Sequence, residues 1–77
     1  MATHHFEIVT DGADLLEWDT LEALYEAGCN DATIGHNTVE FDREAPSLDE
    51  ALRSARRAVE SVPGVRVCSI RLEPALT

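Results

Sequence analysis

The histidine, cysteine and aspartate side chains near the start and middle of the chain are the residues best suited to hold a metal ion. His4, His5, Cys29 and Asp31 are all ligand types that zinc accepts in proteins. Adjacent histidines on an extended strand point to opposite faces, however, and no C-x-x-C or H-x-x-x-H spacing joins any two of these residues. We therefore expect no metal site and no cofactor. These four residues are the candidate ligands should a metal ion bind.

No residue pattern matches nucleophilic or acid–base catalysis. Ser47 stands where a helix-capping residue is expected, and no motif arranges a histidine or carboxylate around it. Glu7, Glu40 and Asp42 are expected on an exposed sheet face, which lacks the pocket that proton transfer requires. The sequence therefore predicts no catalytic residues and a chain that is not an enzyme.

Net charge argues against direct nucleic-acid binding. Fifteen acidic residues face six cations, all of them arginines, and the net charge is −9 at pH 7. Such a balance repels phosphate backbones, and the face where RNA-recognition motifs stack bases is expected to carry carboxylates here. A basic surface could form only on the second predicted helix, at Arg53, Arg56 and Arg57. We expect these arginines to be solvated or paired with Glu22 and Glu26.

Hydrophobic spacing predicts the first strand and helix. Residues 5–10 alternate between apolar and polar, as in a half-buried strand, with Phe6 and Ile8 on one face. Asp11 or Asp14 is expected to cap the helix that follows, and Gly28 to end it. The predicted inner stripe of that helix comprises Leu15, Trp18, Leu21, Leu24, Tyr25 and Gly28.

The middle of the chain is predicted to form a β-hairpin across His36-Asn37 or across a slightly wider loop. Strands over 32–35 and 39–42 would place Ile34 opposite Val39 and Ala32 opposite Phe41. Because this register puts all four apolar side chains on one face, the hydrophobic pattern and the turn agree.

A second helix and a last strand complete the pattern. Ser47 and Glu50 form a capping box, and Pro63-Gly64 ends the helix. Residues 65–72 are rich in β-branched side chains, but their alternation slips between Val67 and Cys68, which indicates a bulge and leaves the inner face open. The predicted inner stripe of the helix comprises Leu48, Ala51, Leu52, Ala55, Val59 and Val62.

This order of elements predicts one α+β domain over residues 1–77. The expected fold is a βαββαβ ferredoxin-like split sandwich, with a four-stranded antiparallel sheet of order 4-1-3-2 and two helices on one face. Its two cysteines are expected to be reduced thiols. The start of the chain lacks a signal-peptide pattern and no apolar run is long enough for a membrane span, so we expect a cytoplasmic protein.

Two resemblances suggest a regulatory role. The stretch 11–28 is similar to the first βα unit of ACT domains, βαββαβ modules that hold an amino acid at a dimer interface. It lacks the proline of their Asp-x-Pro-Gly turn. That resemblance implies that Asp11 and Gly12 line a ligand site.

The stretches 26–35 and 39–51 resemble a small bacterial βαββαβ family without assigned activity. Its members occur alone or ahead of a helix-turn-helix segment. This resemblance implies an accessory or regulatory module.

The residues favour a non-catalytic protein–protein interaction or oligomerisation domain. An open sheet face, unpaired outer strands and a small core all favour self-association, so the expected partner is a second copy or another protein. The alternative is an ACT-like amino-acid sensor. The expected interface residues lie on the last strand and beside it: Val9, Val65, Val67, Ser69 and Arg71.

Overall fold

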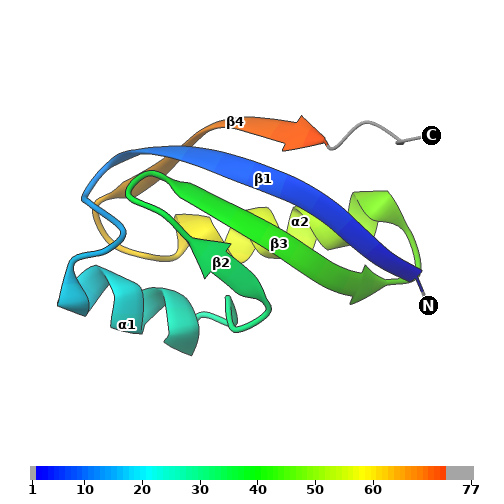
Figure 1. Ribbon diagram of the computed structural model, residues 1–77, viewed down its shortest axis with the longest axis horizontal. Helices are drawn as coiled ribbons and strands as arrows, with labels where there is room; N and C mark the ends of the chain where they lie inside the picture. The colour runs from blue at the N-terminus through cyan, green and yellow to red at the C-terminus, as the bar shows by residue number, and fades with distance from the viewer. Residues whose placement is uncertain (1, 73–77) are drawn as a thin grey trace.

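The computed structural model describes residues 2–72, which form a four-stranded antiparallel sheet and two helices (Figure 1). The strands lie in the order β2-β3-β1-β4, which confirms the predicted ferredoxin-like α+β fold. In chain order the elements are β1 (Ala2–Gly12), α1 (Trp18–Glu26), β2 (Ala32–Ile34), β3 (Thr38–Ala45), α2 (Leu48–Glu60) and β4 (Val65–Leu72).

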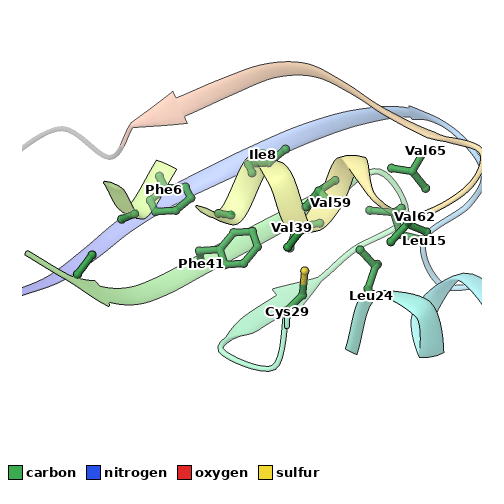
Figure 2. Packing of buried hydrophobic residues seen from close by; sticks show 14 residues of the cluster. Phe6, Ile8, Leu15, Leu24, Cys29, Val39, Phe41, Val59, Val62 and Val65 are labelled. Atoms are coloured by element: carbon green, nitrogen blue, oxygen red, sulfur yellow. The ribbon is translucent and has the colours of Figure 1, made fainter. Parts of the chain in front are cut away.

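The core forms where the two central strands present apolar side chains to the helices. Alternation along β1 turns Phe6 and Ile8 inward, and both are fully buried. Phe6 lies directly opposite Phe41 of β3, and their rings stack with centroids 5.3 Å apart. Figure 2 shows Val39 and Val59 completing the cluster between β3 and α2.

The predicted hairpin register is confirmed. Ile34 pairs with Val39 and Ala32 with Phe41. The backbone N–H of Gly35 donates to the carbonyl oxygen of Thr38 at 2.8 Å and closes the turn over the two residues between them.

α2 covers the inner face of the sheet. Ser47 is its N-cap and accepts a hydrogen bond from the backbone N–H of Glu50 at 3.2 Å, which is the forward half of the predicted capping box. The reciprocal bond from the Glu50 side chain is not among the hydrogen bonds of residues 2–72. The buried residues of α2 are small, so the helix packs closely against β1, β3 and β4. They are Ala51, Ala55, Ala58 and Val59.

α1 lies beside the β2 edge of the sheet and covers much less of it than α2 does (Figure 1). Leu24 is its one fully buried residue, and it joins the same core as α2. The prediction that Trp18 and Tyr25 face inward is wrong, because their exposed fractions are 73% and 51%. At this edge only a narrow strip of the helix meets the core, so the rest of its apolar stripe faces solvent.

The start of α1 also differs from the prediction. Glu17 is the N-cap and makes no side-chain cap. Asp14 instead accepts a hydrogen bond from the backbone N–H of Leu16 at 3.0 Å, so it closes the turn before the helix. Asp11 accepts from the backbone N–H of Gly12.

Of the two expected alternatives for the α2 arginines, pairing with Glu22 and Glu26 of α1 is wrong, whereas their exposure to solvent is confirmed. Arg53 pairs with Asp49 at 2.8 Å and Arg56 with Glu60 at 3.2 Å, both one turn away on α2 itself. Because α1 is displaced toward β2, Arg53 and Arg56 pair with acidic residues of α2 itself and not with those of α1.

β4 contains the predicted bulge. Val9 pairs with Ser69 and Thr10 with Val67, so Cys68 is the extra residue. The register settles the inner face that the sequence left open, because each of these residues lies opposite an inward-facing position of β1: Val65, Val67, Ile70 and Leu72.

Two glycines with similar backbone angles test how tightly the connections pack. Gly12 has φ +102° and a Cβ there would lie 2.2 Å from the carbonyl oxygen of Gly64, whereas Gly28 has φ +104° and open space. We expect Gly12→Ala to lower the free energy of unfolding by about 3 kcal/mol or more, against about 1 kcal/mol for Gly28→Ala. Urea unfolding followed by circular dichroism measures both; equal losses would contradict the close packing at Gly12.

Candidate functional site

The predicted interface residues divide between the two faces of the sheet. Val9 and Ser69 are cross-strand partners on the open face, where Arg71 lies opposite Glu7. Val65 and Val67 face the helices, and Val65 is buried in the core. The structure therefore brings three of the five residues together on the open face and places the other two beneath the same strand.

The open face carries charge pairs between neighbouring strands. Arg71 of β4 lies 3.7 Å from Glu7, Arg66 lies 3.3 Å from Asp11, and His5 contacts Asp42. Most of these side chains are well exposed, so each pair contributes little to stability. They make this face a hydrated surface with alternating charge.

The metal-ligand candidates are occupied by separate contacts. The His4 Nε2 atom lies 3.3 Å from the carbonyl oxygen of Ala45, and His5 contacts the Asp42 carboxylate. Cys29 is buried and Asp31 binds an arginine. Within residues 2–72 no three histidine, cysteine, aspartate or glutamate side chains gather closely enough to hold a metal ion.

Arg43 makes the most extensive set of polar contacts in the described chain. Its guanidinium donates to both carboxylate oxygens of Asp31, at 2.9 and 3.0 Å. It also donates to the Gly28 carbonyl oxygen at 2.8 Å and the Ser54 hydroxyl at 3.1 Å. The same group lies 4.8 Å from the centre of the Phe41 ring. One side chain of β3 thus binds both α2 and the connection between α1 and β2.

Sequence reasoning missed this cluster. The one signal was that Arg43 is the single cation in the first fifty residues, amid many carboxylates. The hydrogen bonds to Asp31 raise the pKa of Arg43 above its ordinary value, so the guanidinium stays charged.

Replacement of Arg43 by lysine tests this cluster. An ammonium group cannot reproduce the two-pronged geometry at Asp31 while also reaching Gly28 and Ser54. We expect Arg43→Lys to lower the free energy of unfolding by about 1–3 kcal/mol in urea titrations. Arg71→Lys is the control, because its exposed ion pair should change stability by less than about 0.5 kcal/mol. Equal effects from the two variants would contradict the role of Arg43.

The two free cysteines lie in opposite environments. Cys29 is fully buried, and Figure 2 shows its sulfur directed toward Val39. Burial raises the pKa of the Cys29 thiol, so the reactive thiolate is scarce there. Cys68 is exposed at the bulge of β4.

Thiol labelling tests this difference directly. In dilute native protein we expect a soluble disulfide reagent to react with Cys68 within seconds to minutes and to leave Cys29 unmodified. Denaturant should release the second thiol. The Cys68→Ser variant is the control and should show no fast reaction; rapid labelling of both native thiols would contradict the burial of Cys29.

The turn between β1 and α1 meets the hairpin tip and the end of α2. Leu15 donates its backbone N–H to the His36 carbonyl oxygen at 2.9 Å, and His36 Nδ1 lies 3.2 Å from Asp14. The Leu16 N–H, with His36, holds the pKa of Asp14 below its ordinary value. Nearby, Asp11 pairs with Arg66, and Gly12 lies close to the carbonyl oxygen of Gly64. The ACT-like ligand site at Asp11 and Gly12 stays a prediction.

An incompletely covered apolar strip runs along the helix-facing side of β4. We define the β4 margin as Leu52, Ile70 and Leu72. Leu52 and Ile70 are half-buried and line a groove of about 280 Å³ with Asp49, Arg53 and Arg56, and Leu72 is 52% exposed. The margin continues the hydrophobic core outward past the last strand.

Comparisons of this chain with protein-family models, with curated proteins and with solved structures return no match. Within residues 2–72, neither helix combines the length and apolar character that a membrane crossing requires.

Proposed function

We propose that this chain is a non-catalytic protein–protein interaction domain that self-associates through β4, in an accessory or regulatory role. The observation that carries the proposal is the β4 margin, where apolar side chains reach solvent beside a strand that, in the described part of the chain, is paired on one side only. The regulatory role follows the resemblance to small bacterial βαββαβ proteins.

β4 is the edge of the sheet that offers the longer template. It has eight residues and, within residues 2–72, pairs only with β1, whereas the opposite edge strand β2 has three residues. A free edge presents backbone N–H and C=O groups that a further strand can satisfy. A second copy of β4 in antiparallel orientation would join two sheets into one.

Hydrophobic matching selects one two-fold register for this pairing. If Val67 lies opposite Ile70 of the second copy, Val65 lies opposite its Leu72, and all these side chains stay on the helix-facing side. The β4 margins of the two copies then meet beneath the joined sheet and bury each other's apolar surface. In this register the two-fold axis passes between Cys68 and Ser69.

Charges on the open face limit the strength of such a dimer. The same register sets Arg66 opposite Arg71 of the second copy, and like charges in that position destabilise by roughly 0.2–1 kcal/mol. Asp11 and Glu7 already pair with these arginines on β1, so the row across the interface is neutral in sum. We therefore expect a reversible dimer with a micromolar dissociation constant.

Sedimentation velocity over a concentration series tests self-association. The mass should rise from 8.5 kDa toward twice that value in the micromolar range. Leu72→Lys should keep the chain monomeric, because it places a charge in the proposed interface. Leu16→Lys is the matched control, since Leu16 is 43% exposed and lies outside β4; it should associate like the wild type. A wild type that stays monomeric throughout, or an associating Leu72→Lys variant, would refute the proposal.

Disulfide formation adds a readout that does not depend on a destabilising change. With Cys68 beside the two-fold axis, diamide should oxidise two Cys68 thiols to one intermolecular disulfide and itself take up the two hydrogens. The Cys29→Ser variant should form this dimer and Cys68→Ser should not. Absence of cross-linked dimer at concentrations where sedimentation shows a dimer would place the interface elsewhere.

A further inference from the structure

The outer face of α1 is a second apolar surface, separate from β4. Trp18, Leu21 and Tyr25 follow one another at helical spacing, and with Glu22 and Glu26 they line a shallow groove of about 290 Å³. Both aromatic residues are more than half exposed. A large ring held in water on the outside of a short helix costs free energy that a partner could recover.

The carboxylates of α1 and its N-cap have no cationic partner in the described range 2–72. Glu22 and Glu26 line the groove, and neither they nor Glu17 and Asp19 form an ion pair there, whereas β1 and α2 each pair at least one of their acids with an arginine. α1 has no basic residue in its last turn. Glu26 therefore meets the negative end of the helix dipole, and Glu22 repels it from one turn away.

This charge pattern identifies the chemistry of the occupant. A second copy packed face to face on α1 would bring two sets of unpaired carboxylates together. The arginines of α2 do not supply enough charge. Arg53 and Arg56 are paired with Asp49 and Glu60 on their own helix, which leaves Arg57 as a single cation against the four carboxylates of α1 and its N-cap. The complement of the α1 face is a helix from another protein with an apolar stripe flanked by lysine or arginine.

We propose that the outer face of α1 binds a cationic amphipathic helix of a partner protein. Trp18 and Tyr25 bury against the apolar stripe of that helix, and its cations pair with Glu22 and Glu26. Full burial of an aromatic side chain removes about 150–250 Å² from water, so the face falls short of the ~800 Å² per partner typical of a stable complex. The interaction is therefore transient and weakens as salt concentration rises.

Fluorescence anisotropy of a labelled synthetic peptide tests this proposal. The probe is a leucine–lysine helix with amphipathic spacing, titrated with the full chain at low salt. We expect saturable micromolar binding, and about tenfold weaker binding for Trp18→Ala and for the double variant Glu22→Lys/Glu26→Lys. Trp18→Ala should leave the fold intact, because the ring is mostly exposed.

Matched controls separate this surface from general charge attraction. The variant Glu40→Lys/Glu44→Lys makes the same charge change at exposed positions of β3 and should bind like the wild type. A leucine–glutamate helix and a scrambled lysine peptide should both fail to bind. Equal binding of the acidic or scrambled peptide, equal weakening by the β3 variant, or no binding at millimolar peptide would overturn the proposal.

Self-association must also be measured in the Trp18→Ala variant. The inference requires that this variant still dimerises, because the proposed dimer uses β4. Loss of the dimer in Trp18→Ala would show that a second copy occupies α1 and would overturn the assignment to a foreign cationic helix.

Discussion

The contacts of Arg43 hold α2 and the connection between α1 and β2 against β3. The guanidinium lies against the Phe41 ring, which stacks on Phe6 in the core, and it binds Asp31 with two hydrogen bonds. Its bond to the Gly28 carbonyl oxygen attaches the segment that follows α1 to β3, and its bond to Ser54 attaches α2. Without these contacts a nine-residue helix with one buried side chain would have little to position it.

The position of α1 explains why the molecule exposes apolar surface in two places. α2 alone spans the inner face of the central strands, and its small buried residues leave the β4 margin incompletely covered. α1, held at the other edge, contributes Leu24 to the core and turns Trp18 outward. Because β2 and β4 are opposite edges of the sheet, a dimer at β4 leaves the α1 face free for a different partner.

Local sequence patterns predict the sheet well, because strand alternation and turn chemistry are short-range properties. The pairing of Ile34 with Val39 and the bulge at Cys68 both follow from the parity of apolar residues. The facing of α1 could not be predicted in the same way. Spacing shows that Trp18 and Leu24 belong to an apolar stripe, but it does not show how much of that stripe another element covers.

The candidate site was harder to predict than the fold. The partners of Arg43 lie 11 to 15 residues away in the chain, beyond the reach of a spacing motif. The expected interface residues on β4 share one strand, yet the bulge divides them between the two faces of the sheet. What they have in common is the backbone edge of β4, which lies next to the β4 margin. Surface chemistry of this kind emerges only when tertiary packing decides which apolar residues stay outside.

The outward position of Trp18 distinguishes this packing of α1 from one in which the helix buries its whole apolar stripe. Acrylamide quenching of tryptophan fluorescence measures it, since Trp18 is the single tryptophan of the chain. In dilute native protein we expect emission like that of a hydrated indole, with quenching nearly as strong as in the urea-unfolded chain. A blue-shifted emission that acrylamide barely quenches would show that α1 packs this ring against the core.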